Sequence, residues 1–153
     1  MNAKQIIAIE KIVKRAQLTH QDFREVEMFR NEAFDYLYAL LLKAPDPRAI
    51  VNSLKLLIHL ARQAAQDSSG PRLPEVFDVA SRFVGHSELD VRSTAARMVV
   101  FGYHMIVGLG KGPDAVGGAA RVQEVVRSFL GSELRPVERG LLEKLLGNIE
   151  AQV

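Results

Sequence analysis

The sequence predicts an all-α protein of about seven helices, arranged as stacked antiparallel helix pairs. Apolar residues recur at steps of three and four along most of the chain, which is the period of a helix. No segment alternates with the period of two that a half-buried strand requires. A helix–turn–helix joint also recurs along the chain, which favours stacked pairs over a single bundle.

The first half of the chain holds three predicted helices, over about 2–17, 22–43 and 46–66. Each carries an apolar residue at every third or fourth position, as an amphipathic helix does. Two of the three helix starts also carry capping signals. The residues concerned are Thr19 and Asp22 at capping-box spacing, and Asp46 followed by Pro47 at the first helical position.

The second half begins after the loop "DSSGPRLP" at 67–74, where turn-forming residues gather. Four further helices are predicted, over about 73–84, 87–107, 114–130 and 136–151. Short polar or glycine-containing stretches separate them. The residues predicted as N-caps in this half are Ser87, Asp114 and Ser132.

The joint "RFVGHSELDV" (82–91) is repeated as "SFLGSELRPV" (128–137), and "LLKAPDPRAI" is a looser version. The caps Asp46, Ser87 and Ser132 lie 41 and 45 residues apart. Such periods are typical of two-helix solenoid repeats. The repeat therefore predicts one helical-repeat domain over 1–153, with a capping helix at 1–20 and helix pairs at 22–66, 73–107 and 114–151.

The motif Val91-Arg92-x-x-Ala95-Ala96, just after a polar turn, resembles the second helix of a HEAT repeat. The resemblance implies a right-handed solenoid in which the valine and alanines face the core. It also implies that Arg92 pairs with acidic turn residues of a neighbouring repeat. It names no function. The alternative fold is a compact helical bundle.

The helix over 87–107 is expected to be the central one, because it carries little polarity apart from Arg97 and His104. Its "MVVF" stretch, 98–101, is interpreted as core rather than as part of a cofactor site. Ala95 is expected at a close contact between helices.

Composition excludes several function classes. The chain has no cysteine, which excludes disulfides, thiol catalysis and cysteine-ligated zinc and fits the cytoplasm. A net charge of +2 is too small to imply a nucleic-acid partner by itself. The N-terminus lacks the apolar core of a secretory signal, and no apolar run approaches the ~20 residues of a membrane span.

No catalytic, cofactor or metal motif is predicted. "GLGKGPDAVGG" (108–118) differs from a phosphate-binding loop, because Gly112 follows Lys111 and no strand precedes it. The histidines fall in neither H-E-x-x-H nor E-x-x-H patterns. They are His20, His59, His86 and His104. We therefore expect a protein that is not an enzyme and carries no cofactor or metal.

The predicted function is that of an interaction module that binds another protein. In HEAT-like pairs the second helices line the concave face, and here they carry two polar stripes of mildly basic character. An acidic protein surface suits such a face. The candidate partner-binding residues are Asn52, Lys55, His59, Arg62, Arg97 and His104.

The alternative is a nucleic-acid partner held by a basic stripe on the first helix. That stripe consists of Lys4, Lys11, Lys14 and Arg15. Residues 1–20 carry a charge of +3 and residues 21–36 a charge of −3. A third interpretation is therefore that these are ordinary solvated faces that partly neutralise each other.

Overall fold

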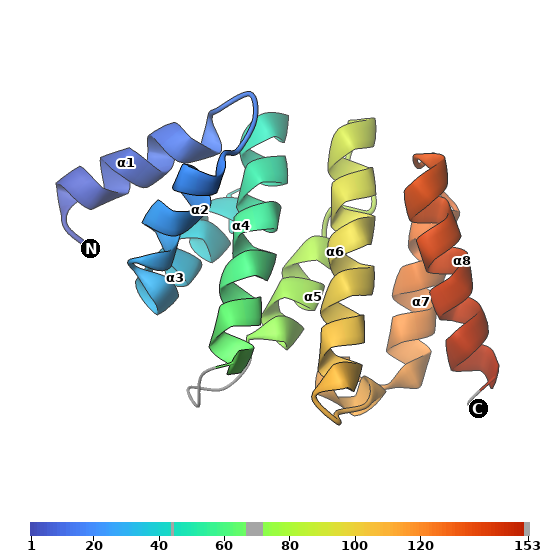
Figure 1. The fold of residues 1–153 in the computed structure, drawn as a ribbon. Helices are drawn as coiled ribbons and strands as arrows, with labels where there is room; N and C mark the ends of the chain where they lie inside the picture. Colours follow the sequence, from blue (N-terminus) through green and yellow to red (C-terminus); the bar gives the residue numbers. More distant parts are fainter. Residues whose placement is uncertain (44, 67–71, 152–153) are drawn as a thin grey trace. The chain divides into compact units, whose positions relative to one another are not determined.

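The computed structural model describes residues 1–43, 45–66 and 72–151, and within them it contains helices and turns but no strand (Figure 1). The prediction of an all-α fold is confirmed. These residues form eight α-helices and one 3-10 turn, where about seven helices were predicted.

The chain divides into two compact units, Met1–Arg72 and Leu73–Val153. Each is described below by itself. The predicted loop at 67–74 falls at this division, but its residues 67–71 lie outside the described part of the chain. The single domain over 1–153 stays a prediction.

The first unit consists of α1 (Ala3–Val13), α2 (His20–Glu27), α3 (Arg30–Leu42) and α4 (Pro47–Gln66). Helix α4 contacts the other three and so organises the unit. The side chains that fill it are fully buried aliphatics, as the helical period predicts. They include Ile12, Leu37, Leu41, Ile50 and Leu57.

The two capping signals predicted in the first unit are confirmed. The Thr19 Oγ1 accepts the Asp22 N–H at 3.2 Å, and the Asp22 carboxylate accepts the Thr19 N–H at 3.0 Å. Asp46 accepts the Ala49 N–H at 3.0 Å at the start of α4. These bonds satisfy amide groups that a helix start leaves without partners.

The continuous helix predicted over 22–43 is wrong. Helix α2 ends at Glu27 and α3 begins at Arg30, whose φ of 41° lies in the left-handed region. The chain changes direction there, and the Met28 side chain between the two helices is 77% exposed. The sequence does not show the break, because the buried residues on its two sides, Val26 and Ala33, continue the apolar spacing of a single helix.

The second unit consists of α5 (Leu73–Ser81), α6 (Leu89–Gly108), the 3-10 turn η1 (Pro113–Val116), α7 (Ala119–Leu130) and α8 (Pro136–Ala151). Helix α5 packs on α6, α7 packs on α8, and α6 lies beside α8 (Figure 1). Two helix hairpins thus share a core. Its fully buried members include Phe77, Val99, Val126, Phe129 and Leu142.

Three predicted N-caps of the second unit are wrong. Glu88, not Ser87, precedes α6, and it makes no capping bond through its side chain. The Ser132 hydroxyl donates to the Phe129 carbonyl, and α8 begins only at Pro136. Asp114 lies in η1, and Gly118 is the N-cap of α7. The paired glycines end η1 with positive φ angles, which few other residues adopt.

The middle of α6 is largely covered, as expected, but Phe101, His104 and Val107 are exposed. Ala95, Met98, Val99 and Val100 are buried, and Ala95 is fully inaccessible. Phe101, which was predicted to be core, is instead 38% exposed. The "MVVF" stretch therefore contributes three core residues and one surface aromatic ring.

Candidate functional site

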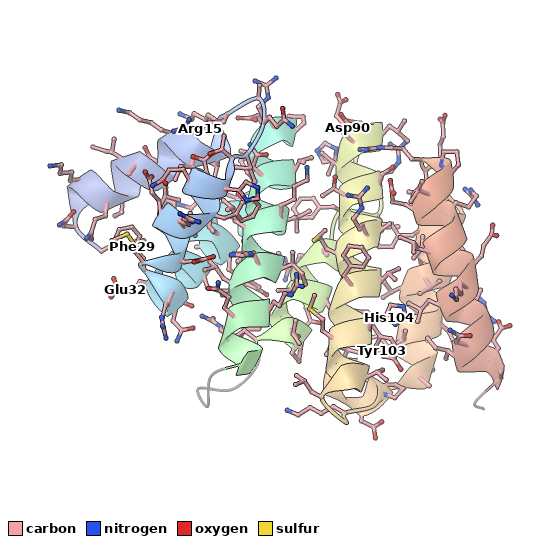
Figure 2. The ribbon with its side chains drawn as sticks, in the orientation of Figure 1. Arg15, Phe29, Glu32, Asp90, Tyr103 and His104 are labelled. Carbon is pink, nitrogen blue, oxygen red and sulfur yellow. The ribbon has the colours of Figure 1, made fainter. Side chains whose placement is uncertain are left out.

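The exposed face of α6 carries an aromatic ring between two basic residues. Arg97 precedes Phe101 by four positions and His104 follows it by three, so all three share one side of the helix. His104 is exposed on α6 (Figure 2), and the Arg97 side chain is about one-third exposed. We call Arg97, Phe101 and His104 the α6 face.

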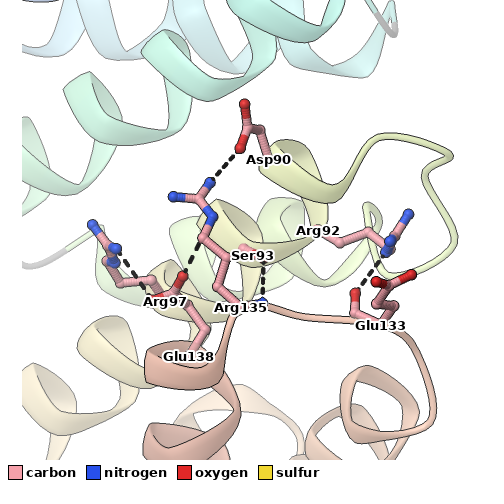
Figure 3. Close-up of polar contacts among 7 residues, drawn as sticks. All are labelled: Asp90, Arg92, Ser93, Arg97, Glu133, Arg135 and Glu138. Carbon is pink, nitrogen blue, oxygen red and sulfur yellow. Dashed lines mark hydrogen bonds and ion pairs between the residues drawn. The ribbon is translucent and has the colours of Figure 1, made fainter.

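The position of Arg97 is fixed by a buried carboxylate on α8 (Figure 3). Its Nη2 lies 3.2 Å from the Glu138 Oε2, and the Glu138 side chain is only 1% exposed. The other carboxylate oxygen makes no hydrogen bond but lies 3.8 Å from the Arg135 Nε. A buried charge must be paired to be tolerated, so both arginines contribute to holding Glu138.

Arg135 also links the start of α8 to α6 (Figure 3). Its Nη2 donates to Asp90 at 2.8 Å, and its backbone N–H donates to the Ser93 Oγ at 3.1 Å. Both acceptors belong to the first turns of α6. The α6–α8 junction is therefore a polar network over an apolar core.

Arg92 links the turn before α6 to the turn before α8. Its Nη1 donates to the His86 carbonyl at 2.7 Å, in the turn before α6. Its Nε donates to the Glu133 carbonyl at 3.1 Å, in the turn before α8 (Figure 3). The HEAT resemblance implied that Arg92 pairs with acidic turn residues, and here it contacts the backbone carbonyl of one such residue, Glu133.

Asn52, a predicted partner-binding residue, does not lie on an accessible stripe, because it is only 4% exposed. Its side-chain amide donates to the carbonyls of Val13 at 2.8 Å and Arg15 at 2.9 Å. These carbonyls lie at the end of α1, where a helix leaves acceptors without partners. Asn52 therefore fastens α1 to α4.

His59 contacts α2. Its Nε2 is hydrogen-bonded to the Glu27 carboxylate, and its ring meets the edge of Phe23 at a centroid distance of 4.9 Å. The hydrogen bond with His59 is the main cause that holds the pKa of Glu27 below its ordinary value, against the opposing effect of desolvation. Arg62 is exposed, and Lys55 is half-buried with an interaction of its own.

The predicted partner-binding residues therefore fall into two sets. Lys55, His59 and Arg62 belong to the first unit, and Arg97 and His104 to the second. Within each set the side chains share one helix. That the two sets form one groove stays a prediction.

One of the four residues of the alternative basic stripe is engaged in an ion pair. Lys4, Lys11 and Lys14 are exposed on and just after α1. The Arg15 Nε, in contrast, lies 3.2 Å from the carboxylate of the buried Asp22. Three of the four side chains are thus accessible cations, and the fourth helps to hold α2.

A cavity of about 180 Å³ lies between α5 and α7. Ligand pockets usually measure about 300–1,000 Å³, so this one is small. Arg121 in its wall is already bound to Asp78 at 2.6 Å and to the Val116 carbonyl at 2.7 Å. The lining residues are Ser81, Val84, Arg121, Glu124, Val125 and Ser128.

The glycine-rich segment before α7 has a structural role. Arg121 crosses Gly117, whose φ is 96°, and a Cβ added there would lie 2.6 Å from the Arg121 Cδ. Among the described residues, no group of three or more His, Asp or Glu side chains is placed to hold a metal ion. No helix in the described ranges combines the length and apolar character that a membrane span requires.

Comparisons of the chain with protein-family models, with curated proteins and with solved structures gave no match. Two residues of the site were not predicted from the sequence. Phe101 was assigned to the core, and Glu138 was assigned no role. An arginine and a glutamate 41 residues apart give no local signal of a pair.

Proposed function

We propose that this protein is a non-enzymatic, HEAT-like interaction module that binds another protein through the α6 face. In this proposal its helix pairs stack as a right-handed solenoid and it acts in the cytoplasm. The hairpins α5–α6 and α7–α8, and the turn-to-turn contacts of Arg92, support the stacking. The absence of cysteine fits a reducing compartment.

The observation that carries the proposal is the exposure of Phe101 between Arg97 and His104. Aromatic side chains, phenylalanine included, and arginine are enriched in the buried cores of protein interfaces relative to the rest of the surface. Arg97 is held by Glu138 before any partner arrives, which lowers the entropic cost of ordering it on binding. The ring supplies apolar contact area, and its basic neighbours favour an acidic partner.

A second candidate surface, in the first unit, is on α4. Lys55 and Arg62 carry positive charge on the helix that holds His59 against α2. Grouped positive charge speeds capture of an acidic partner more than it tightens the complex. We therefore expect Lys55→Glu with Arg62→Glu to slow association, whereas Phe101→Ala speeds dissociation.

The test uses the full chain as bait in native lysate, followed by affinity measurements with the purified partner. Phe101→Ala should weaken binding about 30-fold, which is the ~2 kcal/mol typical of a strong interface residue. Leu89→Ala is the matched control, because Leu89 is an exposed apolar residue at the other end of α6, about three turns from Phe101. Equal affinities for the wild type and Phe101→Ala would refute the proposal.

The same measurement distinguishes the nucleic-acid alternative from the protein-binding proposal. If the partner is lost on nuclease treatment, and its affinity falls by orders of magnitude between low and moderate salt, phosphate contacts dominate. Lys11→Glu with Lys14→Glu would then abolish binding and Phe101→Ala would not. That result would replace the α6 face by the basic stripe of α1.

A further inference from the structure

The side of α1 that points away from the core is basic and carries one apolar side chain. Helix α1 contributes the buried Ile9, Ile12 and Val13 to the core of the first unit. On the opposite side, at about 100° per residue, lies a row of exposed residues. We call this row the α1 outer face, and it consists of Lys4, Ile7, Lys11 and Lys14. The Ile7 side chain is 51% exposed.

The side of α3 that points away from the core is acidic and also carries apolar side chains. Helix α3 buries Ala33, Phe34, Leu37 and Leu41. The exposed row opposite them is the α3 outer face, which consists of Glu32, Asp35, Ala39 and Leu42. Among the described residues of the first unit, the exposed large apolar side chains are Ile7, Met28 and Leu42. Two of these three therefore lie on the two outer faces.

Both acids of the α3 outer face remain accessible. The Glu32 carboxylate contacts the terminal amine of Met1, yet its side chain is 65% exposed. Asp35 lies 2.7 Å from the Arg72 Nη2, yet its side chain is 67% exposed. Ion pairs as exposed as these contribute little to stability, so a further cation can approach either carboxylate at low cost.

The two outer faces adjoin each other on the first unit. The Tyr36 hydroxyl of α3 donates to the Glu10 carboxylate of α1 at 3.1 Å. Tyr36 directly follows Asp35, and Glu10 directly precedes Lys11, so this bond joins the edges of the two faces. A partner that covers one face therefore also reaches the other.

The residues of the two outer faces have the same spacing, i, i+3, i+7 and i+10. An α1 outer face can therefore pair with an α3 outer face along its whole length. In the antiparallel direction the opposed residues are Lys14 and Glu32, Lys11 and Asp35, Ile7 and Ala39, and Lys4 and Leu42. Both acids then meet lysines, and the remaining lysine lays its apolar stem on a leucine. In the parallel direction Ile7 would instead lie opposite Asp35.

We propose that the protein forms a two-fold symmetric dimer, in which the α1 outer face of each copy packs antiparallel on the α3 outer face of the other. Each copy carries both faces, so a two-fold axis between the copies forms the contact twice. Opposite charges select the register, and Ile7 supplies apolar contact. A second copy fits this surface better than a nucleic acid does, because phosphates would leave Ile7 uncovered and would be repelled by Glu32 and Asp35.

The dimer does not depend on the α6 face. Its contacts all come from the first unit, whereas Phe101 belongs to the second. Phe101→Ala should therefore leave dimerisation unchanged, and the charge reversals described next should leave the α6 face intact. Failure of one proposal is thus distinguishable from failure of the other.

The test is analytical ultracentrifugation of the purified, nuclease-treated full chain over a range of concentrations. We expect a reversible equilibrium between the 17.0 kDa monomer and a dimer. Lys11→Glu and Asp35→Lys each place like charges opposite one another twice per dimer. Each variant alone should therefore dimerise at least tenfold more weakly than the wild type.

An equimolar mixture of these two variants should recover the wild-type affinity as a heterodimer. The glutamate introduced by Lys11→Glu would then face the lysine introduced by Asp35→Lys, and the unchanged Asp35 of one copy would face the unchanged Lys11 of the other. If circular dichroism shows that Asp35→Lys does not fold, Lys14→Glu and Glu32→Lys form the second mixing pair.

Lys111→Glu is the matched control, because it reverses an exposed lysine of the second unit and should leave the dimer unchanged. A monomer at every concentration would overturn the proposal. So would a dimer that is insensitive to both reversals, or a mixture of the two variants that stays monomeric. Assemblies larger than a dimer, or association that requires added nucleic acid, would overturn it as well.

Discussion

The guanidinium of Arg92 bridges two turns of the chain, and its Nε donates to the Glu133 carbonyl at 3.1 Å. One side chain of α6 thus contacts the backbone before α6 and the backbone before α8. A forked guanidinium suits this task, because its donors point in fixed and different directions.

Arg92→Lys should destabilise the protein by about 1–2 kcal/mol, since an ammonium cannot serve both carbonyls and each lost bond is worth about 0.5–1.5 kcal/mol. Urea unfolding measures this. Arg82→Lys is the control, because Arg82 is exposed in the turn between α5 and α6. An equal unfolding free energy for Arg92→Lys and the wild type would contradict the bridging role.

Ala95→Leu should cost roughly 1–3 kcal/mol, because Ala95 is fully inaccessible in α6 and a larger side chain overpacks the core. Thermal denaturation checks the effect. Ala120→Leu makes the same change at an exposed position of α7 and should be nearly neutral. Similar melting temperatures for the two variants would mean that α6 is covered less tightly than its burial indicates.

Arg97→Met should destabilise the protein by about 2–4 kcal/mol, because it leaves Glu138 buried with Arg135, 3.8 Å away, as its one remaining cation among the described residues. Glu138→Leu in the same chain should recover much of the loss, since a well-packed apolar side chain replaces a buried ion pair with little penalty. A double-mutant cycle by chemical denaturation measures the coupling. Additive effects would show that the pair is not an energetic unit.

Asn52→Ala should cost about 2–3 kcal/mol, because two carbonyls at the end of α1 lose their donor in a buried site. Hydrogen exchange should become faster in the last turn of α1. Asn31→Ala, at an exposed position of α3, serves as the control and should leave exchange in α1 unchanged. Unaltered α1 protection in Asn52→Ala would contradict the fastening role.

The contact of Glu27 with His59 should make stability depend on pH. The folded-state pKa of Glu27 is lowered, so its ionised form stabilises the fold above about pH 4.5 and this contribution is lost as pH falls below that value. The advantage of the wild type over Glu27→Gln should therefore shrink between about pH 5 and pH 3. Denaturant unfolding across this range is the measurement, and a constant difference would contradict the assignment.

Most of the helical architecture could be predicted from the sequence because apolar period and capping are local properties. Asp46 and the pair Thr19–Asp22 act as predicted because a cap binds amides three residues away. The break at Arg30 was missed because no glycine or proline marks it. The prediction that Asp114 is the N-cap of a long helix was wrong because a proline followed by an acidic residue can also begin an isolated 3-10 turn.

The candidate site was less accessible to sequence reasoning, because it depends on contacts distant in the chain. Asn52 was correctly recognised as polar, but its acceptors lie 39 and 37 residues away at the end of α1. Phe101 continues an apolar run, so only the packing of α6 reveals that its ring is partly exposed.

The buried carboxylate of Glu138 also bears on how α6 and α8 can be aligned along their length. Apolar side chains alone tolerate sliding, because one leucine fits the place of another. A shift of one helical turn, about 5.4 Å, would carry Glu138 away from Arg97 and Arg135 and leave its charge unpaired in the interior. The pairing of this charge therefore favours one register between the two helices, whereas the shapes of the apolar side chains alone would allow several.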